Sequence, residues 1–550
     1  MEPDSKTHRS YMKILTSGQH RQADTHTIKN GVPSLDLMET AARAFSHFFL
    51  NRELHETVHV FCGTGNNGGD GMAIARLLDL LVIDVKAYMV HYSNNYSGDM
   101  IANYKRLDDT DVEVNQIYSK DDFPEIEEGD TIVDALFGTG LNRPAEGMVK
   151  ELIEYLNGTG NNIYSVDIPS GLFADRYTPE EYAVIRSEYT LTFTSPKLAF
   201  LLPFSQRYIG QFAVMDIGID KEYIESLDTP YYYMLNQDVE KLYRKRRRFD
   251  HKGNFGHALI IAGSSGKTGA AVLATRGALV AGAGLVTAYV PKSSYGILQT
   301  AVPEAMTEVD ADEKIMYFNY EVQPDVIGIG PGLGTAGETV EGFADFLKRN
   351  EKPLVIDADA LNILALEPSL LGHLPEGCIL TPHEGEFKRL AGPWKDDFDK
   401  LEKLMDFSRR HRCVMVLKGA YTVIAYEGNY YFNSTGNPAM ATAGMGDVLT
   451  GIITGLRAQS YSPLHAAILG VYLHGLAGNQ LYWKMKRKTL LAGDIISMYP
   501  EAVHTMLTFD TTPEVMSYLE MPFTDDIDYF DEEFFDDMFD PLDEDDDLPE

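Results

Sequence analysis

Residues 57–81 read TVHVFCGTGNNGGDGMAIARLLDLL, which is an apolar run, a loop with five glycines in nine positions and a stretch with helical periodicity. A strand that passes into a helix through such a loop is typical of a doubly wound α/β domain. Glycines let backbone amides approach an anion, and a helix start favours negative charge. The loop therefore predicts a phosphate or ribose site, although its spacing does not match GxxxxGKS/T. The alternative is a strained turn in which Asp70 only caps the helix.

The same alternation of apolar runs and helical stretches continues to about residue 235. Helices are expected at 71–81 and 147–157. Further strands are expected at 84–90, 131–136, 162–167, 189–194 and 212–217. Short apolar strands between helices indicate a parallel sheet that is covered on both faces. We therefore expect a Rossmann-like three-layer sandwich over residues 1–235, with its ligands at the carboxyl ends of the strands.

A second doubly wound α/β domain is expected over residues 236–508. Its strands are expected at 257–262, 285–290, 325–329, 353–357, 378–381 and 413–418, with a hairpin at 421–433. Its helices are expected at 269–282, 446–457 and 463–480. The basic segment KLYRKRRRFDHK at 241–252 joins the halves, and we interpret it as a solvated charge run rather than a nuclear-import or nucleic-acid signal.

The charge balance excludes several classes of partner. The 550 residues carry a formal net charge of −35, which repels nucleic-acid phosphates and anionic membranes. Residues 522–550 hold 15 Asp and Glu and no Lys or Arg, so 509–550 is expected to be a disordered acidic tail, with a partner-binding motif as the alternative. There is no long apolar run, and three cysteines form no CxxC pair. We therefore expect a cytoplasmic protein in a reducing compartment.

Polar residues follow several strands of the first half. Asp134 and Asp167 each end a strand, and such carboxylates meet in the crevice above a parallel sheet. Asn67, Asp134 and Ser170 offer hard oxygen ligands that suit an alkali or alkaline-earth cation. An Asx-turn role is the alternative for each carboxylate. Lys197 is a further candidate, with an ordinary surface lysine as the alternative.

In the second half, the most informative block is NPAMATAGMGD at 437–447, directly before a helix. Small residues there leave helix amides free to hold a transferring phosphoryl group, and Asp447 could accept a proton from an attacking hydroxyl. Helix capping is the alternative for Asp447. The stretch 418–422 could hold nucleotide phosphates, and Glu386 could hold a hydrated Mg²⁺. His383 is a ligand contact or, alternatively, a satisfied buried histidine.

The blocks GNNGGDG, VDALFGTG, DIPSG and TFTSPK, in this order, resemble the NAD(P)H-hydrate epimerase family over about residues 12–220. The resemblance implies a K⁺ ion on Asn67, Asp134 and Ser170, and Asp167 is our candidate acid/base. It also implies contacts to the hydrated nucleotide from Asn66, Asn67, Gly68, Gly69, Asp70, Gly138, Thr139, Gly140, Leu141, Asn142, Arg143, Pro144 and Asp167.

The blocks GPGLG, DADALN, TPHEGE, KGAYT and GNPAMATAGMGDVLTG resemble the ADP-dependent NAD(P)H-hydrate dehydratases of the ribokinase-like superfamily, over about residues 240–500. This resemblance implies ADP as co-substrate, with Mg²⁺. The implied hydrate contacts are Ala283, Gly332, His383 and Asp447. The implied ADP contacts are Lys418, Gly419, Ala420, Tyr421, Thr422 and Gly446. Lys267-Thr268 and Glu384 depart from the family pattern, which puts only local substrate contacts in question.

Together the resemblances imply a bifunctional repair enzyme that epimerises NADHX and NADPHX and dehydrates one epimer at the expense of ADP. Two alternatives stay open. One is a ribokinase-like small-molecule kinase fused to a nucleotide-binding domain, and the other is a non-catalytic nucleotide sensor. The expected partners are small molecules and further copies of the chain, as a homo-oligomer, with no nucleic acid and no membrane.

Overall fold

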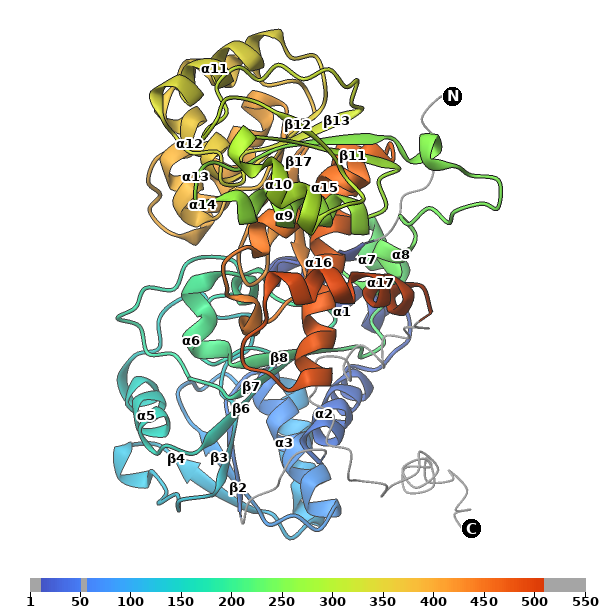
Figure 1. The fold of residues 1–550 in the computed structure, drawn as a ribbon. Helices are drawn as coiled ribbons and strands as arrows, with labels where there is room; N and C mark the ends of the chain where they lie inside the picture. Colours follow the sequence, from blue (N-terminus) through green and yellow to red (C-terminus); the bar gives the residue numbers. More distant parts are fainter. Residues whose placement is uncertain (1–10, 51–56, 509–550) are drawn as a thin grey trace, which may run out of the picture.

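The computed structural model describes residues 11–50 and 57–508, which form two α/β units, one above the other in Figure 1. The lower unit holds a seven-stranded sheet in which all neighbouring strands are parallel. In sheet order its strands are β4 (Glu113–Ile117), β3 (Val85–Val90), β2 (Val58–Cys62), β5 (Thr131–Ala135), β6 (Asn162–Val166), β7 (Tyr189–Phe193) and β8 (Gln211–Met215). Sequence patterns predicted all of these except β4, whose residues EVNQI are mostly polar and half-exposed at the sheet edge.

Helices cover both faces of this sheet, as expected for a three-layer sandwich. One apolar core joins the sheet to α2 (Ser34–Leu50) and α3 (Asn66–Leu80), and a second core lies under α5 (Gly147–Gly158). Helix α3 begins five residues earlier than the periodicity of 71–81 predicts, because the glycine loop itself forms its first turn. Shorter helices complete the unit: α1 (Ser17–Lys29), α4 (Gly98–Arg106), α6 (Gln206–Ile209) and α7 (Lys221–Ser226).

The upper unit holds an eleven-stranded sheet whose central strands are parallel. Its order is β1 (Met12–Lys13), β9 (Tyr231–Met234), β18 (Asn429–Asn433), β17 (Val423–Tyr426), β16 (Val414–Leu417), β15 (Ile379–Leu380), β14 (Leu354–Ile356), β13 (Val326–Ile329), β10 (His257–Ile261), β11 (Leu285–Val290) and β12 (Met306–Val309). The run from β16 to β12 is parallel, and β17 and β18 form the expected antiparallel hairpin. This unit is the second doubly wound domain.

Two separate apolar cores flank this second sheet. One face carries α9 (Thr268–Val280), α15 (Met445–Ala458), α16 (Pro463–Met485) and α17 (Ala492–Thr508). The other face carries α11 (Gly337–Arg349), α12 (Ala358–Leu366), α13 (Glu384–Ala391) and α14 (Asp397–His411). Two short helices, α8 (Asn236–Glu240) and α10 (Tyr295–Ala301), complete it. Within the described ranges 11–50 and 57–508, no helix has the length and apolarity needed to cross a membrane.

The boundary between the two units differs from the expected division at residue 235, because two strands from before this residue belong to the second sheet. Strands β1 and β9 come from the first part of the sequence but extend the second sheet, where β9 pairs in parallel with β18. Tyr231 stacks on Tyr430 and Tyr232 on Tyr431, with ring centroids 5.1 and 5.4 Å apart. These strands cover an edge that would otherwise leave its hydrogen-bonding groups unpaired.

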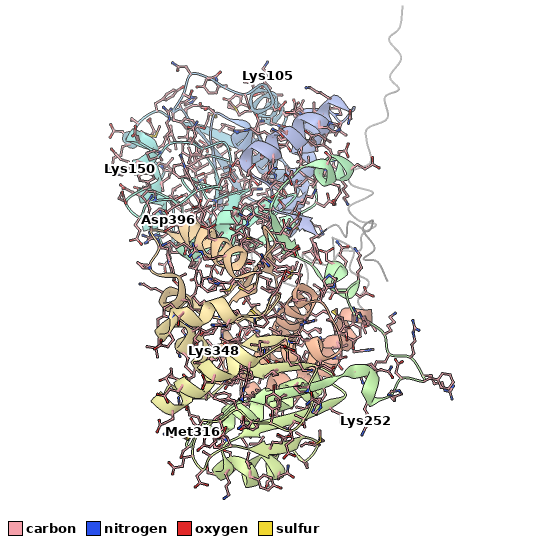
Figure 2. The ribbon with its side chains drawn as sticks, turned by 90° about the horizontal axis from the view of Figure 1, so that it is seen from above. Lys105, Lys150, Lys252, Met316, Lys348 and Asp396 are labelled. Atoms are coloured by element: carbon pink, nitrogen blue, oxygen red, sulfur yellow. The ribbon has the colours of Figure 1, made fainter. Side chains whose placement is uncertain are left out.

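The basic junction follows β9 and α8. Figure 2 shows it as a segment that stands out beside Lys252, with its side chains directed away from the body. Residues 244–249 are exposed, although Arg244 lies over Tyr461 and Arg246 lies over Phe255. This placement is that of a solvated charge run. The predicted acidic tail, 509–550, lies outside the described residues.

Candidate functional site

A cavity of about 650 Å³ opens above the carboxyl ends of the strands of the first sheet. Residues of the glycine loop, of the loop after β5 and of α1 line it. Among the residues predicted to bind the hydrated nucleotide, its lining includes Asn66, Asn67, Asp70, Gly138, Thr139, Gly140, Leu141, Asn142, Arg143, Pro144 and Asp167. Gly68 and Gly69 are not in this lining. The structure therefore brings two loops, some 70 residues apart in sequence, to one cavity.

The glycines of the first loop serve backbone packing as well as access to the cavity. A Cβ atom on Gly63 would lie 1.9 Å from the carbonyl oxygen of Leu136, and one on Gly68 would lie 1.8 Å from the carbonyl oxygen of Gly63. Gly65 is the N-cap of α3, so Asp70 is not the cap. The alternative reading of Asp70 as a helix cap is therefore wrong.

Lys197 is buried rather than on the surface. Its side chain is 2% exposed, and its Nζ lies 2.8 Å from Oδ1 of Asp167 and donates to the carbonyl oxygen of Phe193 at 3.2 Å. Burial opposes ionisation of Asp167, but the charge and hydrogen bond of Lys197 outweigh it and hold the pKa of that carboxyl below its usual value. Asp167 also has a φ of +65°, an uncommon backbone conformation that often marks functional sites.

Three further titratable residues surround this pair, and the sequence patterns assigned chemistry only to Asp70. Burial, with added repulsion from Asp167, raises the pKa of Asp24 to about 6 and raises that of Asp70 strongly. Burial and the charge of Lys197 lower the pKa of His20 to about 3, so this imidazole is neutral. His20 and Asp24 lie on α1, and both line the cavity. No sequence pattern indicated their role, because they lie on one short helix that is far in sequence from the glycine loops.

The proposed cation ligands gather around the segment that follows β5. Asp134 is fully buried, and its Oδ2 accepts from the Ser165 hydroxyl and from the Ser170 backbone N–H, both at 2.8 Å. The Ser170 hydroxyl accepts from the N–H of Phe137 at 2.8 Å. Asn67 lies against Gly138, and its buried amide nitrogen has no hydrogen-bond partner.

This oxygen-rich cluster fits a weakly hydrated cation. Burial raises the pKa of Asp134 although several hydrogen bonds oppose the rise, so a nearby cation would stabilise its ionised form. The unpartnered Asn67 amide marks a polar group that awaits a ligand, since the oxygen and nitrogen of such an amide exchange places by a simple flip. The donor set is therefore compatible with K⁺, and Asn67, Asp134 and Ser170 would hold it.

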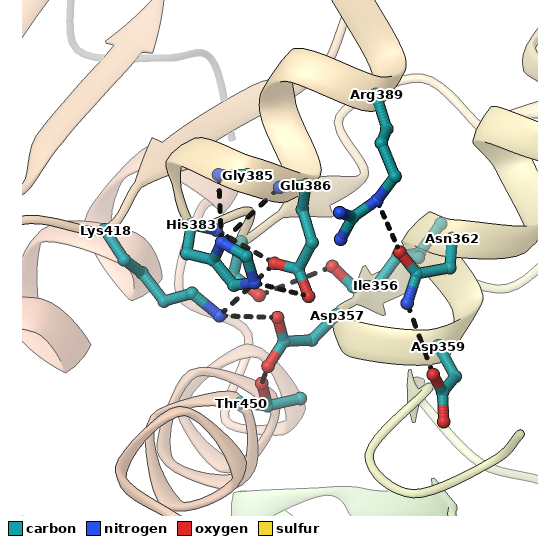
Figure 3. A network of polar contacts seen from close by, with 11 residues as sticks. Ile356, Asp357, Asp359, Asn362, His383, Gly385, Glu386, Arg389, Lys418 and Thr450 are labelled. Atoms are coloured by element: carbon teal, nitrogen blue, oxygen red, sulfur yellow. Dashed lines mark hydrogen bonds and ion pairs between the residues drawn. The ribbon is translucent and has the colours of Figure 1, made fainter. Parts of the chain in front are cut away.

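The second site lies where β14, β15 and β16 end side by side (Figure 3). Lys418, directly after β16, places its Nζ 2.7 Å from Oδ1 of the buried Asp357. The hydroxyl of Thr450, on α15, donates to Oδ2 of Asp357 at 2.6 Å. Glu386 completes the network, with Oε2 3.9 Å from the same Nζ. The ammonium group of Lys418 is thus fixed in the site by two buried carboxylates, those of Asp357 and Glu386. Sequence patterns indicated no role for Asp357, because its block, DADALN, is also typical of a helix start.

Asp447 lies close enough to this second network for its charges to act on it. Helix α15 begins at Met445 with Gly444 as its N-cap, so capping does not explain Asp447. A Cβ on the adjacent Gly446 would lie 3.3 Å from Nζ of Lys418. Burial and the charge of Asp357 raise the pKa of Asp447 to about 6, while Lys418 opposes the rise. A half-buried carboxylate with this pKa, beside glycine amides at a helix start, is suited to general-base chemistry.

His383 is exposed, which excludes the alternative of a satisfied buried histidine. It caps α13: its Nδ1 accepts from the N–H of Gly385 at 3.0 Å. The neutral ring therefore carries its proton on Nε2, which lies 3.4 Å from Oε1 of Glu386. Glu386 in turn accepts from the backbone N–H of His383 at 2.9 Å. The capping pair presents an imidazole at the mouth of the site.

Gly332 lies on the far side of the same group of loops. Its carbonyl oxygen accepts from the Ser264 hydroxyl at 2.7 Å, and a Cβ on it would touch Lys267 and Ala270. Lys267, which departs from the family pattern, pairs with Asp359 at 3.2 Å. The unusual lysine is thus held by a carboxylate at the site.

Ala283 is not brought to the site. It lies in the turn between α9 and β11, at the amino end of that strand, next to residues packed on the entry to β10. The ligand-bearing loops follow the opposite, carboxyl ends of the same strands. Ala283 was expected to contact the hydrate, but it lies in a close-packed turn: a Cβ on Gly284 would lie 1.8 Å from the carbonyl oxygen of Lys252.

The residues that would bind Mg²⁺ are already engaged. Both oxygens of Asp357 and of Glu386 have protein partners, and the described ranges hold no group of three or more His, Cys, Asp or Glu placed to bind a metal. A protein-only Mg²⁺ cage does not fit this arrangement. A Mg²⁺ that keeps its waters and arrives on nucleotide phosphates does fit it.

Comparisons with known proteins agree with this division into two sites. A family model described as NAD(P)H-hydrate dehydratase matches residues 258–501, and one described as YjeF-related protein N-terminus matches residues 34–199. The bifunctional NAD(P)H-hydrate repair enzyme Nnr of Moorella thermoacetica is 36% identical over 521 residues, covering 90% of this chain and 97% of that protein. The Escherichia coli protein of the same name is 34% identical over 460 residues, covering 82% of this chain and 85% of that protein.

Among the solved structures similar to part of this chain is the ADP/ATP-dependent NAD(P)H-hydrate dehydratase from Bacillus subtilis, co-crystallised with ATP and Mg²⁺, with 31% identity and a TM-score of 0.43. The match covers 50% of this chain and 97% of that one.

Proposed function

The chain belongs to the family of bifunctional NAD(P)H-hydrate repair enzymes, and on that premise we propose that each unit carries one of the two activities. The cavity of the first unit interconverts the R and S epimers of hydrated NADH and NADPH. The loops of the second unit restore the S epimer to NADH or NADPH at the expense of ADP, giving AMP and phosphate. ADP and the hydrates are the small-molecule partners of this proposal. Association into a homo-oligomer and a cytoplasmic location stay predictions.

In the first cavity, epimerisation needs a group that accepts a proton and a group that gives one. Lys197 keeps Asp167 ionised, so Asp167 is the proposed base beside the hydrated ring. Asp70 keeps its proton to higher pH than an exposed aspartate, so it is suited to the acid role. Two carboxyl groups with pKa values pushed apart can pass a proton across one ring.

The cluster of Asn67, Asp134 and Ser170 is proposed to hold K⁺, whose charge would compensate the buried Asp134 and so keep the loop after β5 in place. Replacing K⁺ by Li⁺ in the buffer should lower the epimerisation rate severalfold, because Li⁺ is small and strongly hydrated. The dehydration rate of the purified S epimer is the control, since its site lies in the other unit. An equal fall in both rates would contradict a K⁺ role confined to the first cavity.

In the second site, the hydroxide of the hydrate is a poor leaving group until it is phosphorylated. Asp447 takes the proton of the ring hydroxyl, whose oxygen attacks the β-phosphorus of ADP while the bond from that phosphorus to the AMP oxygen breaks. Amides near Gly446 and the ammonium of Lys418 stabilise the charge on the transferred group. Phosphate then leaves with the ring oxygen, a proton leaves the neighbouring carbon, and the double bond is restored.

The observation that carries this proposal is the position of Asp447, half-buried at the bare start of α15 and next to the Lys418–Asp357 ion pair. The test mixes acid-hydrated NADH with the protein and ADP and follows absorbance at 340 nm. Full recovery of both epimers supports both units, and recovery of one epimer restricts activity to the second. A kinase would instead leave a stable phosphoester without free phosphate, and a sensor would give no turnover.

A further inference from the structure

The hairpin loop Lys418–Thr422, here called the ADP loop, is held at its two ends and exposed in the middle. At one end the Lys418 backbone N–H donates to the carbonyl oxygen of Pro382 at 2.9 Å. At the other the carbonyl oxygen of Thr422 accepts from the N–H of Asn433 at 2.9 Å. Gly419 and Ala420 are exposed between them. Within the loop, the Gly419 N–H donates to the Thr422 hydroxyl at 3.3 Å, and this hydroxyl donates to the carbonyl oxygen of Gly419 at 3.1 Å. These bonds hold the backbone of the loop, and none of them uses the large side chain of Tyr421.

Tyr421 is instead in contact with the first unit. Its ring centroid lies 5.9 Å from that of Phe212, at an interplanar angle of 37°. Phe212 lies on β8, the edge strand of the first sheet and the one nearest the second unit in Figure 1. Its side chain is only 7% exposed, so this contact is made inside the interface between the units.

Phe212 is itself firmly held from both sides. It lies 5.5 Å from Phe200 of its own unit and 6.5 Å from Tyr233 of β9, measured between ring centroids. Tyr233 pairs with Phe432 in the second sheet, and Phe432 pairs with Val423, directly after the ADP loop. One apolar core contains these residues from both units. An apolar interface of this kind fixes the orientation of two domains.

We infer that Phe212, a residue of the epimerase unit, is a positioning residue for the dehydratase site: through Tyr421 it holds the ADP loop in the form that binds ADP. The inference rests on the proposed ADP-dependent dehydration. The two activities are then physically linked, because a residue of one unit sets the nucleotide affinity of the other. Phe212 itself touches neither the proposed substrate nor the Lys418–Asp357 pair.

The test uses the full chain and the purified S epimer, so that the first activity is bypassed. Phe212→Leu should raise the KM for ADP roughly three- to tenfold, the factor expected for the loss of one buried aromatic pair, with little change in kcat. Phe212→Tyr keeps the ring and should restore the wild-type KM. Phe204→Leu is the matched control, because Phe204 makes another ring contact between the units, 6.0 Å from Phe398 of α14, which is not a residue of the ADP loop. Its KM for ADP should stay unchanged.

A double-mutant cycle with Tyr421→Leu tests the route. If Phe212 acts through Tyr421, the double variant should have the same KM for ADP as Tyr421→Leu alone. Epimerase activity and a melting curve on each preparation check that β8 is intact, and Phe212→Met replaces the leucine variant if that one does not fold. An unchanged KM in a folded Phe212→Leu overturns the inference but leaves the proposed function standing. Wild-type protein without ADP-dependent dehydration overturns both.

Discussion

Two carboxylates, Asp167 directly after β6 and Asp447 in the first turn of α15, lie in two similar α/β units, yet the structure shifts their pKa values in opposite directions. Asp167 has a buried ammonium, that of Lys197, 2.8 Å away, which keeps its pKa low. Burial and the charge of Asp357 raise the pKa of Asp447 to about 6, and Lys418, which is already paired with Asp357, opposes the rise only in part. Whether the nearest lysine pairs with the carboxylate itself or with another carboxylate, and not burial alone, therefore decides the direction of the pKa shift.

The largest expected effect comes from removing the carboxylate of Asp447. Asp447→Asn should lower the dehydration rate about 10³-fold, because the amide cannot take the hydroxyl proton. The change is measured from the recovery of absorbance at 340 nm with the purified S epimer. Binding of ADP, measured by calorimetry, and the epimerisation rate should both persist. Loss of ADP binding would mean that Asp447 holds the nucleotide instead of acting as a base.

The next largest effect is expected from removing Lys197, the lysine that pairs with Asp167. Lys197→Met leaves a buried carboxylate without its partner, which should cost about 3–5 kcal/mol of stability and abolish epimerisation. Chemical denaturation followed by fluorescence measures the change. Lys150→Met is the control, because its ion pair with Glu154 is exposed at 3.8 Å and should contribute about 0.5 kcal/mol or less. Equal losses in the two variants would show that Lys197 does not stabilise a buried charge.

The difference in pKa also predicts a difference in pH dependence. A base must be ionised, and the ionised fraction of Asp447 falls as the pH drops through about 6. Dehydration at saturating ADP should therefore fall roughly tenfold between pH 7 and pH 5. Asp167 has a lowered pKa and stays ionised over this range. The residual rate of Asp447→Asn should lack the pH 6 transition, and its persistence in that variant would assign the transition to another group.

The smallest effect is expected for a region outside both sites. Deleting residues 522–550 removes 15 acidic residues and should change neither activity nor melting temperature, because the described body already contains both networks. Steady-state rates and thermal melts compare the truncated and full chains. A large loss of either would mean that the acidic segment packs against the body.

Sequence patterns predicted much of this molecule because they are local. Local patterns of apolar residues and glycines predicted both α/β units. The same patterns predicted the glycine loop after β2 and the block before α15. Sequence patterns were not enough where partners are far apart in sequence. Lys197 was a candidate with an ordinary surface lysine as the alternative, and only the fold placed Asp167 beside it. Ala283 was expected at the substrate site but lies at the opposite end of the strands.

The amino-acid sequence by itself determined which residues follow the ends of strands, and hence the two places where ligands can bind. It could do so because strand and helix formation depend on residues that are close in sequence. Only the tertiary structure decided the charge state of the carboxylates at those places, the addition of β1 and β9 to the second sheet and the contact of Phe212 with Tyr421. The physical reason is that burial and Coulomb interactions depend on distances in space, and residues far apart in sequence come close only when the chain folds and the two units pack together.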